Sequence, residues 1–210
     1  MASAPVPSPG SSPTPQPPAR RGRGRRPADE VRADILAAAG TLLLGEGMAA
    51  FTIERVAATA GVSKMSIYKW WPSKGALALD GYFDAVQNIL AFPDTGDIEA
   101  DLLTQLRAFV HLTAHTPAGR VVAELVGQAQ TDPDLAAAFR EHYSAPRRRL
   151  AVQALERAQQ RGQLRADADP RIIVDQLWGA CYHRLLIPDE PLTEEFAHGL
   201  VTNLINGLRP

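Results

Sequence analysis

The chain has a single cysteine, Cys181, in 210 residues. No intrachain disulfide is therefore possible, and one lone thiol is typical of a protein from a reducing compartment. The sequence also lacks a run of about 18 apolar residues, the length that a membrane-spanning helix needs. Its N-terminus lacks the basic start and apolar stretch of a secretory signal. These absences predict a cytoplasmic protein that does not enter a membrane.

Two further patterns are missing. No extended alternation of apolar and polar residues is present, so no β-sheet is predicted. No phosphate-cradling glycine loop, nucleophile elbow or pair of catalytic carboxylates can be recognised, and we predict neither enzymatic activity nor a cofactor. What is present is an ordinary globular composition, with 45% hydrophobic and 21% charged residues, on a chain long enough to bury a sizeable core.

The net charge of −1 hides an uneven distribution. Residues 20–80 hold ten basic and six acidic side chains, a net charge of +4, whereas residues 81–210 hold 12 basic and 17 acidic side chains, a net charge of −5. A basic N-terminal part followed by an acidic C-terminal part indicates that the N-terminal part binds an anion such as nucleic acid. The alternative is the ordinary drift of surface charge along a chain.

The N-terminal segment is predicted to be a flexible arm over residues 1–26. Residues 1–19 carry seven prolines and no charged side chain, so they cannot bury enough apolar surface to offset the entropy of ordering. Five arginines follow on a glycine-containing stretch, which suits the phosphates or the narrow minor groove of DNA. A solubilising tail is the alternative interpretation.

From Asp29 onward, apolar side chains recur at helical spacing. Three helices are predicted first: one from Asp29 to about Gly45, a short one capped by Thr52, and a third capped by Ser63. Gly61 lies in the turn between the second and third helices, where glycine tolerates a positive φ. This spacing is typical of a helix-turn-helix.

The third predicted helix is the one that can enter a major groove. Val62 and Ile67 should point to the core and leave the polar side chains outward. Lys64 and Ser66, near its leading end, can reach base edges, whereas side chains further along can reach phosphates. With the arm included, the predicted DNA-binding residues are Arg23, Arg25, Arg26, Thr52, Ser63, Lys64, Met65, Ser66, Tyr68, Lys69, Trp70 and Lys74.

Further helices are predicted to fill the rest of the chain, about nine in all. The pairs Thr116-Pro117, Asp132-Pro133 and Asp169-Pro170 each place a capping residue before a proline at the first helical position. Pro146 should kink or break a long helical stretch. The arginine run at 147–149 is interpreted as a solvated helix face.

The helix-turn-helix resembles the DNA-binding domain of the TetR family (TetR/AcrR-like regulators). The resemblance covers residues 29–78, although the family more often has smaller aromatics where this chain has Trp70-Trp71. A C-terminal subclass of the same family is resembled over most of residues 95–208. The N-terminal motifs that carry the likeness are Thr52-Ile53, Gly61-Val62-Ser63, Tyr68 and Trp71-Pro72-Ser73-Lys74.

The resemblance implies an all-helical homodimer, with a DNA-binding domain at 27–75 and a ligand-binding and dimerisation domain at 76–210. The expected activity is that of a repressor released from a palindromic, double-stranded operator by a small molecule. The expected ligand-pocket residues are Phe83, Phe109, Leu112, Leu125, Trp178 and Tyr182. The expected dimer-interface residues, on the last two helices, are Leu177, Leu185, Phe196, Leu200 and Leu204.

Two alternatives stay open beside this interpretation. An architectural DNA-binding protein without an effector would show weak sequence preference and a filled C-terminal core. A metal sensor would use His111 and His115, which share a helix face at i, i+4, with Cys181 and His183 as further ligands. An ordinary histidine pair is the simpler interpretation, and no metal site is predicted.

Overall fold

The computed structural model describes residues 26–187 and 189–209, and within these ranges all regular structure is helical. Segments α7, η1 and α8 follow one another without a break and count as one helix. The described residues therefore form nine continuous helices, as predicted. In chain order the elements are α1 (Ala28–Glu46), α2 (Ile53–Ala60), α3 (Lys64–Tyr68), α4 (Lys74–Val86), α5 (Ile98–His115), α6 (Ala118–Ala129), α7 (Pro133–Phe139), the π-helical η1 (Arg140–Ser144), α8 (Ala145–Gln160), α9 (Pro170–Leu186) and α10 (Glu194–Leu208).

Side-chain caps begin α2, α3, α7 and α9 at the positions that the sequence indicated. The expected start at Thr116-Pro117 is different, because Pro117 occupies the N-cap position of α6 and the helix begins at Ala118. Thr52 and Ser63 accept hydrogen bonds from the backbone N–H groups three residues ahead, at the starts of α2 and α3. Asp132 and Asp169 cap α7 and α9, and each is followed by a proline in the first turn. Such a cap satisfies backbone donors that have no partner inside the helix.

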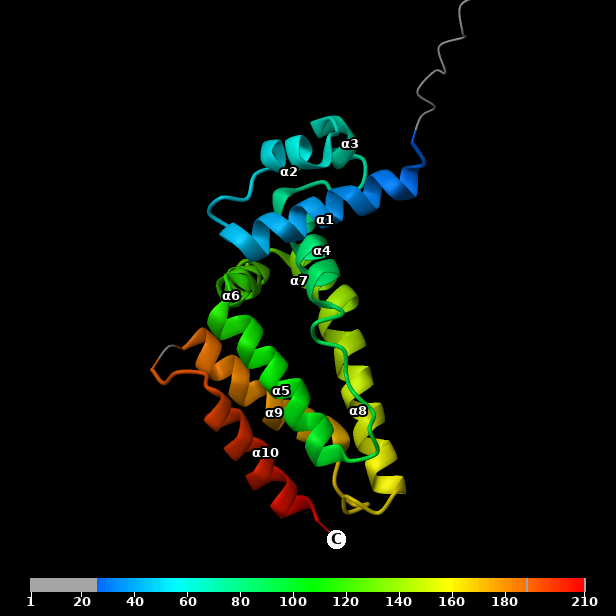
Figure 1. Ribbon diagram of the computed structural model, residues 1–210, viewed down its shortest axis with the longest axis vertical. Helices are drawn as coiled ribbons and strands as arrows, with labels where there is room; N and C mark the ends of the chain where they lie inside the picture. Colours follow the sequence, from blue (N-terminus) through cyan, green and yellow to red (C-terminus); the bar gives the residue numbers. More distant parts are fainter. Residues whose placement is uncertain (1–25, 188, 210) are drawn as a thin grey trace, which may run out of the picture.

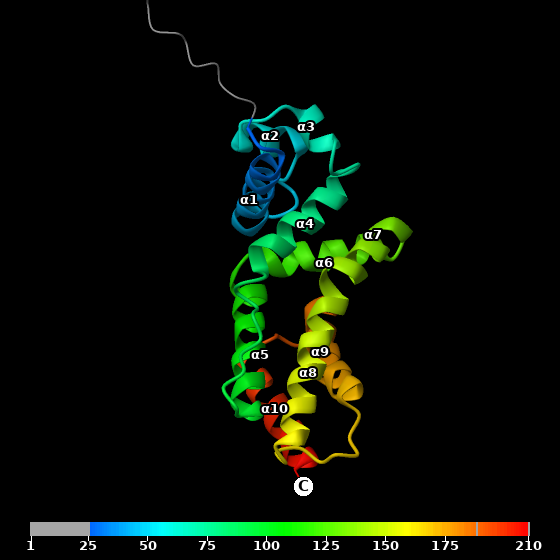
Figure 2. The same ribbon diagram turned by 90° about the vertical axis from the view of Figure 1, so that its right-hand side faces the viewer.

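The molecule is elongated, with α1–α3 at one end and the long helices α5, α8, α9 and α10 at the other (Figures 1 and 2). Helices α6 and α7 lie across the middle. Helix α4 packs along α1 and also contacts α6, α7 and η1. It therefore joins the two ends, and the predicted boundary at residue 75 falls in its first turn.

The crossing of α1 and α4 depends on two glycines. A Cβ atom built on Gly81 would lie 2.6 Å from the Cβ of Ala39, and one built on Gly40 would lie 2.8 Å from the Cβ of Ala85. Carbon atoms this close repel strongly, so only glycine allows the two helices to approach to this distance. The position of α4 relative to the first three helices is set at this contact.

Pro146 bends the chain without ending the helix. It lies in the first turn of α8, directly after the π-helical turn η1. A proline ring clashes with the carbonyl four residues earlier and leaves it without a hydrogen bond, and a wider π turn relieves both problems. The predicted kink is thus a π-helical segment that turns Tyr143 inward, where its side chain is buried.

The apolar core is continuous through both ends of the molecule. Among its members is Cys181, which is fully buried. Burial raises the pKa of the Cys181 thiol to about 12, so the group stays protonated near neutral pH and packs as a small apolar side chain. No helix in the described part of the chain is both long and apolar enough to cross a membrane.

Candidate DNA-reading surface and ligand cavity

The turn between α2 and α3 has the geometry that its sequence predicts. Gly61 ends α2 in the left-handed region, with φ 66° and ψ 36°. Ser63 then caps α3, and its Oγ atom lies 3.0 Å from the Oγ atom of Ser66. Val56 and Ile67 are fully buried and fix the two short helices against the core. The outer face of α3 is therefore exposed to solvent, while its inner face packs on the core.

The exposed face of α3 carries the side chains expected to read DNA. Met65 is 72% exposed and Tyr68 is 49% exposed, which is unusual for such large side chains. Lys64 is also exposed, and its Nζ atom lies 3.1 Å from Oε1 of Glu54 on α2. This ion pair is open to water and is worth little, so phosphates or base edges can displace Glu54.

The other predicted DNA-binding residues lie around this face. Lys69 is exposed beyond the end of α3, and Lys74 lies at the start of α4 with its Nζ atom 3.4 Å from the carbonyl oxygen of Met48. Trp70 is half-buried against Trp71, with 5.8 Å between the ring centroids. Arg26 forms an ion pair with Asp34 of α1. Arg23 and Arg25 lie outside the described residues.

Asp80 of α4 links the end of the molecule that contains α1, α2 and α3 to the remaining helices. Its Oδ2 atom accepts a hydrogen bond of 2.9 Å from Nε1 of Trp71 and lies 3.6 Å from Nη2 of Arg32 on α1. Its Oδ1 atom lies 3.1 Å from Nδ1 of His142 on η1. We call these four residues the Asp80 cluster. Helical spacing could not reveal it, because its members come from four separate segments.

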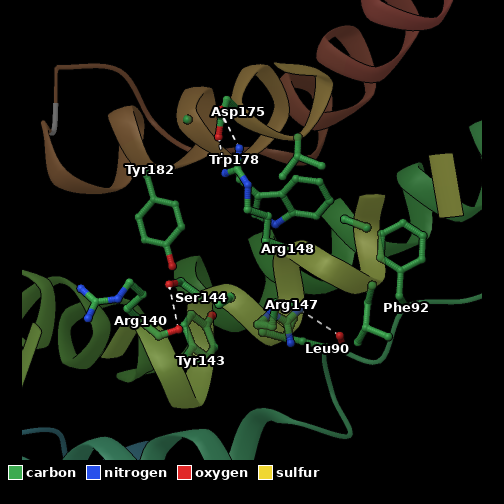
Figure 3. A pocket seen from close by; sticks show the side chains of 15 residues that line it. Leu90, Phe92, Arg140, Tyr143, Ser144, Arg147, Arg148, Asp175, Trp178 and Tyr182 are labelled. Carbon is green, nitrogen blue, oxygen red and sulfur yellow. Dashed lines mark hydrogen bonds and ion pairs between the residues drawn. The ribbon is translucent and has the colours of Figure 1, made fainter. Parts of the chain in front are cut away.

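A cavity of about 470 Å³ lies between η1, α8, α9 and the segment that follows α4 (Figure 3). This volume falls in the range of small-molecule sites. Phe92 and Trp178 face one part of it, with ring centroids 6.5 Å apart. Tyr143 and Tyr182 face another part, where Tyr182 points toward Tyr143 and Ser144.

Three arginines also line this cavity: Arg140, Arg147 and Arg148. The arginine run at 147–149 is therefore only partly a solvated face, because the π turn and the start of α8 direct Arg147 and Arg148 toward the cavity. The signal that could have found Arg147 is its i, i+4 spacing with Tyr143 and Ala151, which line the same cavity.

Of the six expected pocket residues, Trp178 and Tyr182 line this cavity and four do not. Phe83 and Phe109 lie behind the lining in the core: Phe83 stacks on Tyr143 at 4.4 Å, and Phe109 lies 5.7 Å from Tyr182. Leu112 and Leu125 are buried in the core as well. Helical spacing identified their inward faces but could not distinguish core from cavity wall.

The expected interface residues differ in what they expose. Leu177 is fully buried within the protomer, so it has no surface to offer a second subunit. Leu185, Phe196, Leu200 and Leu204 are half-buried at the edge of the core. Three apolar side chains on α9 or directly after it are exposed, namely Ile172, Leu186 and Ile187.

His111 and His115 lie side by side on the exposed face of α5, with 5.3 Å between the ring centroids. The described residues contain no group of three or more His, Cys, Asp or Glu side chains that could hold a metal ion. A pair of imidazoles alone leaves a zinc ion without the third protein ligand that its sites have.

The fold and the exposed α3 define a helix-turn-helix DNA-binding protein. Two family models match the chain: "Bacterial regulatory proteins, tetR family" over residues 35–80, and "Tetracyclin repressor-like, C-terminal domain" over residues 92–204. The chain therefore belongs to the TetR family of transcriptional regulators. It is a DNA-binding regulator of transcription and not an enzyme.

Individual relatives agree with this assignment. The chain is 35% identical to the uncharacterized HTH-type transcriptional regulator YdeS of Bacillus subtilis, over 88% of this chain and 93% of the relative. It is 31% identical to the DNA-binding transcriptional repressor TetR of Mycobacteroides abscessus, over 82% of this chain and 90% of the relative. The solved structure of the TetR family regulator SCO0332 is 62% identical, with a TM-score of 0.80, over 86% of this chain and 100% of that one.

Proposed function

We propose that the protein is a homodimeric repressor that binds a palindromic operator and leaves it when a small molecule occupies the cavity. The observation that carries the proposal is the Asp80 cluster, because it connects η1, which lines the cavity, to Trp71 and Arg32 of the DNA-binding end. The repressor named among the relatives supports the direction of regulation.

The release mechanism follows from these contacts. A ligand in the cavity touches η1 at Tyr143, next to His142, so a change in η1 alters the hydrogen bond to Asp80. Asp80 lies on α4, which packs on α1, and it accepts a hydrogen bond from Trp71, which follows the end of α3. The ligand shifts the protein between two states only if it prefers one of them. In the released state, the two recognition helices of the dimer no longer match adjacent major grooves.

Selection of bound DNA from a random pool, at near-physiological salt, tests the operator. The dimer should recover one palindromic motif with half-sites separated by about 34–36 Å, one turn of DNA. Lys64→Ala should relax base preference at one position of each half-site, a discrimination of about 1–3 kcal/mol. Lys69→Ala should weaken binding to all sequences alike and make the salt dependence shallower, since phosphate contacts release counterions.

Two outcomes would contradict these predictions, the first the operator itself and the second the role of Lys64. Salt-sensitive binding without a motif would favour the architectural alternative. An unchanged base preference in Lys64→Ala would remove Lys64 from the residues that read bases.

The dimer is tested separately on α10. Leu204→Glu should give a monomer by sedimentation analysis and weaken operator binding, because it places a charge on an apolar surface that a second subunit would cover. Ile89→Glu is the matched control, since Ile89 is 47% exposed and lies outside α9 and α10. A dimeric Leu204→Glu protein with wild-type helicity would rule out this face.

A further inference from the structure

The cavity holds a cation that its own surroundings do not neutralise. Arg147 is half-buried and donates from Nη2 to the carbonyl oxygen of Leu90 at 2.9 Å. Its guanidinium also lies 5.4 Å from the ring centroid of Tyr143. Both partners are uncharged, and none of the ion pairs among the described residues includes Arg147. An arginine stays protonated in proteins, so the positive charge cannot be removed by deprotonation.

The neighbouring arginine shows the contrast. Arg148 binds the carboxylate of Asp175 with both terminal nitrogens, and the Nη2–Oδ2 distance is 2.7 Å. Asp175 is the acidic residue in the described lining of the cavity, so its charge is already matched. Arg147, together with the more exposed Arg140, leaves this part of the cavity positive.

Three phenol groups lie close to the same charge. Tyr82, Tyr143 and Tyr182 belong to one cluster, and burial raises the pKa of each while the positive charge of Arg147 acts in the opposite direction. They are therefore neutral near pH 7 and can donate hydrogen bonds. The hydroxyl of Tyr82, buried behind Tyr143, has no hydrogen-bond partner among the described residues. Arg147, Tyr143 and Tyr182 therefore offer hydrogen-bond donors to a ligand in this part of the cavity.

The rest of the cavity is suited to an apolar body. Phe92 and Trp178 form one wall, and Leu150 and Val174 add aliphatic surface (Figure 3 shows the two aromatic rings apart from the phenol groups). Aromatic and aliphatic walls gain free energy by covering apolar ligand surface. A ligand that fits both parts has a charged acceptor at one end and an apolar body at the other.

We propose that the cavity binds a small apolar molecule carrying one carboxylate, with the carboxylate at Arg147, Tyr143 and Tyr182 and the apolar body against Trp178 and Phe92. This inference rests on the proposed function, because it names the chemical class of the effector. A carboxylate supplies the negatively charged partner that Arg147 lacks, and hydrogen bonds between charged groups are stronger than hydrogen bonds between neutral groups. A cationic ligand would meet Arg147 and Arg140 with like charge.

The test compares probes of one shape and three charges: 2-naphthoate, 2-naphthamide and 2-naphthylmethylamine. Phenylalkanoates of increasing chain length, each with its amide, extend the series to other apolar bodies. Binding is measured by calorimetry on the full chain. At least one carboxylate should bind about tenfold or more tightly than its amide, and the amine should bind more weakly than both. Equal affinity of every carboxylate and its amide, or no carboxylate bound up to millimolar concentration, overturns the proposal.

Variants then locate the anion. Arg147→Gln should abolish the preference for carboxylate over amide, and Arg147→Lys should retain part of it. Arg149→Gln is the matched control, because Arg149 is exposed on the same helix and does not line the cavity. Thermal unfolding of each variant separates a lost charge from a lost fold. A carboxylate preference that persists in a folded Arg147→Gln protein overturns the placement of the anion.

Release of operator DNA is measured with the same probes, so that the two proposals fail differently. If a carboxylate binds through Arg147 but does not release DNA, the anion site is supported and the proposed effector role is contradicted. If an amide releases DNA as readily as its carboxylate does, the effector role of the cavity is supported and the anion site is contradicted.

Discussion

Replacing Trp71 by alanine should lower the free energy of unfolding by about 3–5 kcal/mol, the usual cost of truncating a large buried aromatic side chain. Trp71 is 2% exposed, donates to Asp80 and lies under the guanidinium of Arg32. Its loss therefore leaves a cavity and removes the contact that joins the end of α3 to α4. Native domains are stable by only about 5–15 kcal/mol, so this loss is a large part of the total stability. Operator binding should fall as the folded fraction falls.

The measurement is urea unfolding followed by circular dichroism, with operator binding by fluorescence anisotropy. Trp70→Ala is the matched control, because Trp70 is the adjacent tryptophan and is only half-buried. It should cost much less stability. Trp71→Phe keeps most of the packing and loses the hydrogen bond to Asp80, a net cost of about 1 kcal/mol. Equal destabilisation by Trp70→Ala and Trp71→Ala would contradict the structural role given to Trp71.

Replacing Gly119 by alanine should destabilise the protein by about 3 kcal/mol, at the upper end of the cost of overpacking. A Cβ atom on Gly119 would lie 2.1 Å from the carbonyl oxygen of Thr113, where α5 turns into α6. The obstacle is backbone, which cannot rotate away as a side chain can. The corner between α5 and α6 must open, and the thermal unfolding midpoint should fall by many degrees.

Gly127→Ala in the same helix is the matched control. Gly127 is exposed on α6 and has no atom within 4 Å of an added Cβ. Alanine is favoured over glycine inside a helix by about 0.5–1 kcal/mol, so this variant should be slightly more stable than the wild type. The two glycine-to-alanine changes should thus have opposite signs. A stable Gly119→Ala protein would show that the close approach at Thr113 is not required.

Local interactions explain why the N-terminal part could be predicted so fully. The caps Thr52 and Ser63, the positive φ at Gly61 and the buried face of Val56 and Ile67 all depend on residues within a few positions of one another. Such interactions are readable from spacing alone. The placement of Lys64, Met65 and Tyr68 on the exposed face of α3 followed directly from them.

The cavity could not be predicted to the same degree, because it depends on distances between helices. Helical periodicity identifies the inward face of a helix, and both core and cavity residues lie on inward faces. Trp178 was expected in the cavity and lines it, whereas Phe109 was expected there and packs behind Tyr182. The arginine run at 147–149 was interpreted as one solvated face, although successive residues of a helix point in different directions, and only Arg149 is exposed rather than half-buried.

By itself the sequence determined the class of fold, the helix-turn-helix and the side chains presented on its outer face, since caps, turn glycines and helical spacing act over a few residues. The tertiary structure alone decided which inward residues border a cavity, which leucines remain at the surface and which groups meet at Asp80. These features arise where segments distant in the chain pack together. Their positions are set by helix crossings such as the one at Gly40 and Gly81, which no local pattern records.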